Sequence, residues 1–208
     1  MSFQNSLQFG RIAEGVIAQW LASKGLAILP AYEIEKSSGK GPQLFTASNS
    51  YVSPDMLAIG PNMFWAEAKH KSVFTWYRKT SEWTTGIDLR HYEEYLKVQE
   101  KTSIPVWVFF YHMNSVPSFE DRQHGCPANC PTGLFGAHIT HLRSNEHHRC
   151  HAFDRFNPFC SGHGQSGMVY WNPAAFTFHA SVEEICEQIG EQTPQPLESM
   201  ICGNGSRS

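Results

Sequence analysis

Residues 54–69 read P-D-M-L-A-I-G-P-N-M-F-W-A-E-A-K, and this pattern predicts a β-hairpin. The apolar run at residues 56–59 favours a strand, and the Gly-Pro-Asn sequence at residues 60–62 is typical of a turn. Residues 63–68 then resume an extended, largely apolar pattern. Two short strands joined by such a turn pair antiparallel, so the residue before the first strand returns beside the end of the second.

The predicted hairpin brings charged side chains together. Folding back at the turn places Asp55 beside Glu67. Side chains on a strand alternate between its two faces, so Trp65, Glu67 and Lys69 share one face, and the residues between them take the other. A half-exposed hairpin with a surface glutamate–lysine pair would give the same pattern, so this alternative stays open on the hairpin alone.

An amphipathic helix is predicted before the hairpin. Residues 9–21 place apolar side chains at spacings of three and four, which gives one apolar stripe. Glu14 lies at the edge of this stripe, so we expect its carboxylate to lean towards the sheet. The Lys-Gly pair at residues 24–25 is typical of a helix end.

A second helix and a central strand are predicted after the hairpin. Residues 89–99 favour a helix, for which Asp88 is a suitable N-cap. The continuous apolar run at residues 104–111 is typical of a buried strand.

The C-terminal half carries weaker signals of the same kind. Residues 133–142 and 168–171 favour two more strands that extend the sheet. A capping box at residues 181–184 predicts a last helix, in which Cys186 is expected to face the core. From residue 191 the composition turns to Gln, Pro, Gly and Ser, which predicts a disordered tail.

The order helix, three strands, helix, strand, with these charged residues in place, resembles the PD-(D/E)xK nuclease superfamily, in particular its phage- and archaea-type resolvase-like and RecB-like members. The resemblance covers about residues 8–112. It implies an α/β (α+β) fold with a restriction-endonuclease-like core, in which helices flank a central mixed β-sheet in α-β-β-β-α-β order. It also implies that the catalytic residues are Glu14, Asp55, Glu67 and Lys69.

The resemblance further implies a Mg²⁺ (or Mn²⁺) ion held by Glu14, Asp55, Glu67 and the backbone carbonyl of Ala68. Carboxylate and carbonyl oxygens are the ligands that this hard cation prefers. Such an ion lowers the pKa of its bound water and neutralises charge on a phosphate. Lys69 would stabilise the transition state or hold the attacking water.

Cations and aromatic rings are interleaved after the hairpin. Such a loop suits a groove that follows a nucleic-acid backbone and stacks unpaired bases, although an aromatic cap over the sheet edge would show the same composition. The family often places a Gln or Tyr on the following helix, where the candidates are Tyr92, Tyr95 and Gln99. The expected DNA contacts are His70, Lys71, Arg78, Lys79, Arg90, Tyr92 and Gln99.

An insertion at residues 119–165 is rich in cysteine and histidine. Cys126 and Cys130 have the spacing of a structural zinc half-site, and in a reducing compartment grouped cysteines favour metal over disulfides. The simplest zinc (Zn²⁺) ligand set is Cys126, Cys130, Cys150 and Cys160. A flexible insertion with free thiols is the alternative.

Length and composition limit the classes of protein. The 208 residues suit a single nuclease domain over residues 1–190, including the insertion, followed by the tail at residues 191–208. A net charge of −3 argues against a strongly basic, non-specific binder of nucleic acid. The chain has no apolar run of about 18 residues and a polar start, so we expect no membrane partner and a cytoplasmic location, in a bacterium or a phage-infected host cell.

The leading hypothesis is a metal-dependent deoxyribonuclease that acts on DNA in replication, recombination or repair, as a phage-encoded, resolvase-like member would. Resolvase-like members are often dimers, so the resemblance also implies a homodimer. A first alternative is a catalytically inactive nucleic-acid-binding protein of the same fold with a zinc-stabilised loop. A second alternative places the chemistry in the histidine-rich segment, as in small His-metal nucleases.

Overall fold

The computed structural model describes residues 3–31, 42–150 and 167–192. Of the features predicted from sequence, residues 151–165 of the insertion, with Cys160, and most of the C-terminal tail lie outside these described residues.

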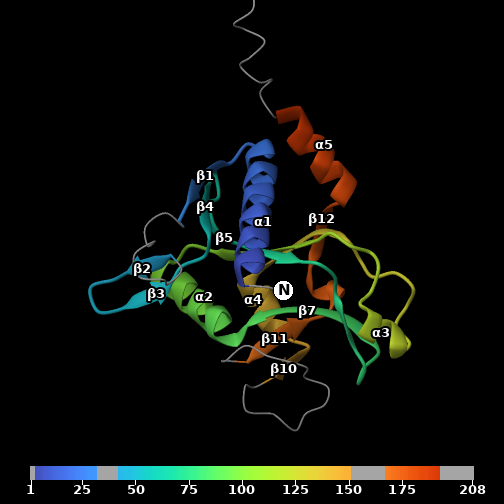
Figure 1. Cartoon of the computed structure of the whole chain (residues 1–208). Helices are drawn as coiled ribbons and strands as arrows, with labels where there is room; N and C mark the ends of the chain where they lie inside the picture. Colours follow the sequence, from blue (N-terminus) through green and yellow to red (C-terminus); the bar gives the residue numbers. More distant parts are fainter. Residues whose placement is uncertain (1–2, 32–41, 151–166, 193–208) are drawn as a thin grey trace, which may run out of the picture.

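A mixed six-stranded sheet forms the centre of the described structure (Figure 1). Its strands lie in the order β1-β4-β5-β8-β9-β12. Strands β5 and β8 pair in parallel, and the other neighbouring strands pair antiparallel. The strand bounds are β1 Ala27–Pro30, β4 Met56–Ile59, β5 Phe64–Lys71, β8 Val106–His112, β9 Gly133–His138 and β12 Thr177–Ala180.

Helices and a second sheet cover the two faces of the central sheet. On one face, apolar side chains of α1 (Phe3–Ser23) and α5 (Val182–Gln192) pack against the sheet. On the other face lie α2 (Leu89–Thr102), α4 (Ile139–Ser144) and a sheet ordered β10-β11-β7-β6. The second sheet comprises β10 His148–Cys150, β11 Met168–Trp171, β7 Glu82–Asp88 and β6 Thr75–Tyr77.

The remaining described elements are short. They are the hairpin of β2 (Gln43–Phe45) and β3 (Ser50–Val52), helix α3 (Phe119–Gln123) and the 3-10 helix η1 (Pro173–Ala175). None of the helices in the described ranges is both long and apolar enough to cross a membrane.

The predicted core architecture is confirmed. Strands β4 and β5 form the expected hairpin, with Met56 opposite Ala66 and Leu57 opposite Trp65. Asp88 caps α2, since its carboxylate accepts hydrogen bonds from the first-turn backbone at Arg90 (2.9 Å). Strand β8 then returns beside β5, which completes the α-β-β-β-α-β order around the extra β2–β3 and β6–β7 pairs.

The last helix begins with the predicted capping box. The Ser181 N–H donates to Glu184 Oε2 at 2.7 Å, and the Glu184 N–H donates to Ser181 Oγ at 3.1 Å. Two N–H groups that the helix itself cannot pair are satisfied in this way. The helix extends to Gln192, two residues into the segment assigned to the tail.

Three sequence predictions for the C-terminal half are corrected by the structure. The strand predicted from residue 133 ends at His138, because the His138 ring accepts from the Thr140 N–H and starts α4. Strand β11 pairs with β7 in the second sheet rather than extending the central one. Cys186 is exposed, because α5 buries Ile185 instead.

Gly86 is required where β7 passes β11. A Cβ atom there would overlap the carbonyl oxygen of Val169 and lie 2.7 Å from the Tyr170 ring. Gly86→Ala is therefore expected to lower the melting temperature by several degrees, since overpacking costs about 1–3 kcal/mol. Thermal unfolding measures the effect.

Gly15→Ala is the matched control for this substitution. Gly15 lies within α1 and has no atom within 4 Å of the added Cβ, so alanine is expected to stabilise the helix by up to about 1 kcal/mol. Equal melting temperatures for the two variants would contradict the steric requirement at Gly86.

Candidate active site

The β4–β5 hairpin fixes Asp55 against the backbone of β5. Asp55 Oδ2 accepts a hydrogen bond from the Ala68 N–H at 2.8 Å. Because β4 begins only at Met56, the side chain of Asp55 takes up an N–H that the strand backbone does not. The carboxylate is thereby held beside Glu67, just before the start of β4 in the interior of the sheet.

Glu67 is a buried carboxylate at the centre of the site. Its side chain is 1% exposed, and one of its oxygens forms an ion pair with the Lys69 ammonium. The Tyr95 phenol is a second donor at this carboxylate. A buried anion with spare acceptor capacity is costly unless a cation or donor completes it.

Burial and neighbouring charges shift the pKa values of Asp55 and Lys69. Burial raises the pKa of Asp55 well above its usual value, and the negative charge of Glu67 raises it further. The Lys69 ammonium and the Ala68 N–H oppose the rise without cancelling it. Burial alone would lower the pKa of Lys69, but the Glu67 and Asp55 carboxylates outweigh it, so this pKa lies above its usual range.

Glu14 belongs to the same electrostatic cluster. Its charge raises the pKa of both Asp55 and Lys69, so α1 brings this half-buried carboxylate within reach of the hairpin. The structure therefore brings Asp55, Glu67 and Lys69 together and places Glu14 in electrostatic range of them, but no three acidic side chains of the described residues are arranged to hold a metal ion.

Tyr95 is the helical residue that faces the acids. Its side chain is buried, and burial, followed by the charges of Glu67 and Asp55, raises the pKa of its phenol. The two other candidates make contacts elsewhere. Tyr92 donates to Glu146 Oε1 at 2.8 Å, and Gln99 Oε1 accepts from the Val106 N–H at 2.8 Å.

His91 was not expected from the sequence. Burial lowers the pKa of this imidazole, the Lys69 ammonium lowers it further, and the Glu67 carboxylate acts in the opposite direction. Its ring centroid lies 6.1 Å from that of Tyr95. The sequence does not predict that His91 lies near the acidic residues, because its position depends on how α2 packs over β5.

The expected DNA contacts fall into three groups. Lys71 is half-buried on the same face of β5 as Lys69, whereas Lys79 and Arg90 are exposed. Arg78 forms an ion pair with Glu120 at 2.7 Å, and His70 Nε2 lies 3.1 Å from Met113 Sδ on the opposite face of β5. Tyr92 is fully buried, and the Gln99 amide oxygen accepts a hydrogen bond from the backbone of β8, so DNA contacts from these two residues stay a prediction.

The aromatic residues after the hairpin pack within the protein. Phe74 is fully buried and stacks on His112 with ring centroids 3.7 Å apart. Trp76 and Trp83 face each other across β6 and β7 at 5.0 Å. These contacts favour the alternative of an aromatic cap over base stacking.

The predicted zinc site stays a prediction. Cys126 and Cys130 are free thiols, and Cys130 Sγ donates to the Asn114 carbonyl at 3.1 Å. Cys150 is disulfide-bonded and so does not present a thiolate, and Cys160 lies outside the described residues. Within the described ranges, no group of three or more His, Cys, Asp or Glu side chains is arranged to hold a metal ion.

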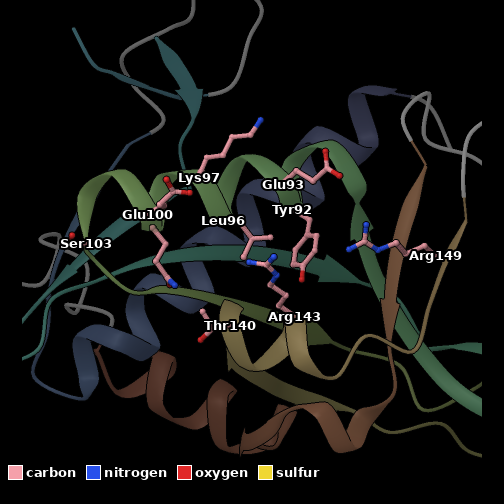
Figure 2. Close-up of a pocket in the computed structure, with 10 residues that line it drawn as sticks. Tyr92, Glu93, Leu96, Lys97, Glu100, Ser103, Thr140, Arg143 and Arg149 are labelled. Carbon is pink, nitrogen blue, oxygen red and sulfur yellow. The ribbon is translucent and has the colours of Figure 1, made fainter. Parts of the chain in front are cut away.

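A separate cavity of about 700 Å³ lies between α2 and α4 (Figure 2). Its walls carry side chains of both charges, among them Glu93, Lys97, Glu100 and Arg143, and Arg149 reaches it from β10. None of the four candidate catalytic residues lines it. The cavity is therefore distinct from the acidic cluster.

The central mixed sheet, with its parallel β5–β8 pair and flanking helices, defines the restriction-endonuclease-like class of fold. Among solved structures, the chain is similar to the Holliday junction resolvase Hjc of Archaeoglobus fulgidus, with 9% identity, a TM-score of 0.42, and coverage of 86% of this chain and 95% of that one. It is also similar to D212, a nuclease from a fusselovirus, with 11% identity, a TM-score of 0.36, and coverage of 91% and 92%.

No family model matches the chain, and no curated protein sequence matches it. Structural likeness at this level does not carry an activity from one chain to another. The function of this chain has to come from its own residues.

Proposed function

We propose that the protein is a metal-dependent deoxyribonuclease that hydrolyses DNA phosphodiester bonds. The observation that carries the proposal is the convergence of Asp55 and Glu67 in a buried setting that raises the pKa of Asp55, with Lys69 on the same strand. Strongly perturbed carboxylates with a specific cationic partner are typical of functional sites.

The donor set fits a hard divalent cation. Two buried carboxylates repel each other, and the two oxygens of Glu67 can accept more than the Lys69 ammonium and the Tyr95 phenol offer. A divalent ion such as Mg²⁺ or Mn²⁺, which prefers oxygen ligands, would reduce the repulsion between the carboxylates and would bind the remaining lone pairs of Glu67. The residues proposed to hold it are Glu14, Asp55, Glu67 and the Ala68 carbonyl. When bound, the ion would supply an activated water and charge neutralisation at the phosphate.

Lys69 and Tyr95 would position the reacting groups. The raised pKa of Lys69 keeps its ammonium charged throughout the neutral range, so it can donate to a phosphate oxygen or to the attacking water. The Tyr95 phenol faces Glu67 and keeps its proton, so it can orient that carboxylate as a donor. Both groups sit on β5 or on the helix that covers it, which fixes their geometry before substrate binds.

A second candidate function is nucleic-acid binding without catalysis. The ion pair between Lys69 and Glu67 favours it, since an ammonium already neutralises one of the two central carboxylates. The described residues also offer no preformed group of three metal ligands. A binding protein of the same fold could keep this ion pair as a purely structural contact.

The proposal extends to finer points that rest on the sequence resemblance. These are a role in replication, recombination or repair, a phage-type origin and assembly as a homodimer. A structural zinc ion is a separate proposal, supported by the spacing of Cys126 and Cys130 and opposed by the disulfide at Cys150.

Purified protein incubated with plasmid, linear duplex, single-stranded and branched DNA tests the proposal. We expect cleavage of at least one of these DNAs with Mg²⁺ or Mn²⁺, and none in EDTA, because the carboxylates need the ion to act on a phosphate. Product formation on a denaturing gel is the measurement. Binding of DNA without cleavage in either metal would instead establish the second candidate.

A further inference from the structure

Lys71 lies on β5 two residues beyond Lys69 and on the same face of the strand. Its register partner on β8 is His112, which is fully buried and stacked on Phe74. The Lys71 side chain is half-buried. It therefore extends the row formed by Glu67 and Lys69 towards the carboxyl end of the strand.

The Lys71 ammonium has no counter-ion in the described part of the chain. Lys69 is paired with Glu67, whereas no carboxylate there lies within ion-pair distance of Lys71. Burial and, to a smaller extent, the Lys69 ammonium together lower the pKa of Lys71 to about 8. A partly buried, unpaired cation is costly, so an anion from outside the described residues would complete it.

The spacing of the two lysines identifies a suitable anion. Residues two apart on one face of a strand are separated by roughly 6.6 Å. Neighbouring phosphates along one nucleic-acid strand are separated by a comparable distance. Two ammonium groups in this arrangement can each contact one of two consecutive phosphates.

We propose that Lys71 binds the phosphate adjoining the one that is cleaved, so that Lys69 and Lys71 together recognise two consecutive phosphates of a single strand. The inference rests on the proposed nuclease function, and it names a requirement of the substrate. A phosphodiester that lacks a charged neighbour on the side of Lys71 is a poor substrate.

Neutral linkages placed in the DNA test this inference. After the cleavage position is mapped, oligonucleotides are made with a single uncharged methylphosphonate at the phosphate on either side of it. For the wild-type protein, one of the two replacements is expected to lower kcat/KM on the order of tenfold, because it removes a charge-assisted contact. In the Lys71→Met protein, the same methylphosphonate is expected to lower kcat/KM only slightly, because the contact is already lost.

Matched variants make the test specific. Lys71→Arg keeps the charge and should keep the penalty. Lys101→Met should keep it too, because Lys101 is exposed in the last turn of α2 and is not one of the expected DNA contacts. Lys71→Met should not lower the melting temperature, since it removes an unpaired charge. The same methylphosphonate penalty in Lys71→Met as in wild type, at both positions, would overturn the inference.

Binding measurements separate this inference from the nuclease proposal. With Ca²⁺ in place of Mg²⁺, the slope of log affinity against log salt is expected to fall by about one unit in Lys71→Met, as for one lost phosphate contact. If wild type binds DNA but never cuts it, the nuclease function fails while a reduced slope still supports Lys71 as a phosphate contact. An unchanged slope refutes that contact in either case.

Discussion

Replacing Glu67 with glutamine is expected to abolish metal-dependent DNA cleavage while the protein stays folded. Glutamine keeps the shape of the side chain but removes its charge, and with it one proposed ligand for the ion. Removal of one preorganised charged group usually costs about 10²–10³ in rate. Glu67 is the one acidic residue of β5, so no other side chain of this strand can replace it.

Initial rates on the preferred DNA, measured beside circular dichroism and thermal unfolding, would check this expectation. Glu93→Gln is the matched control, since Glu93 is an exposed glutamate on α2 outside the acidic cluster. The control should cleave at the wild-type rate. A Glu67→Gln protein that cuts DNA within a few-fold of wild type would remove Glu67 from the proposed metal site.

The second large effect concerns stability in the absence of metal. Because the folded state raises the pKa of Asp55, it favours the protonated carboxyl. The stability from this group is fully present below about pH 4, the ordinary value for Asp, and is lost as the pH rises through the raised pKa. Asp55→Asn cannot ionise, so in EDTA it is expected to become progressively more stable than wild type as the pH increases.

Adding Mg²⁺ should reverse this order. An ion that binds only the folded state stabilises it by mass action, by about 2.7 kcal/mol at a hundred times its Kd. The melting temperature of the wild type should therefore rise with Mg²⁺, while that of Asp55→Asn should not. Melting curves at several pH values, with EDTA and with Mg²⁺, measure both effects. A difference between the two proteins that stays constant with pH would contradict the burial of an ionisable Asp55.

The parts of the fold that local chemistry specifies were predicted from the sequence. A Gly-Pro-Asn turn between two apolar runs allows little besides a hairpin, so the pairing of Asp55 with Glu67 followed from it. The capping box at Ser181 and Glu184 is equally local, because both partners lie within one helical turn. The end of β9 at His138 was missed because an alternating pattern continued into residues that α4 takes up.

The parts of the site that depend on packing were not predicted. Tyr92 and Tyr95 both face inwards from α2, and only the position of the helix over the sheet decides which of them meets Glu67. The placement of His91 depends on the same packing. Cys150 was expected as a thiolate, and its disulfide gave no sequence signal, because cysteine spacing alone does not fix pairing.

Because β5 lies inside the sheet, its odd-numbered and even-numbered side chains point to opposite faces. All the charged groups of β5 proposed to act on DNA, Glu67, Lys69 and Lys71, have odd numbers and share one face. Inserting a single residue between Ala66 and Glu67 would turn every one of them to the side covered by α1, whereas a residue added to the turn at 60–62 would leave them in place. Insertions and deletions should therefore be tolerated in the turn at residues 60–62 but not in β5.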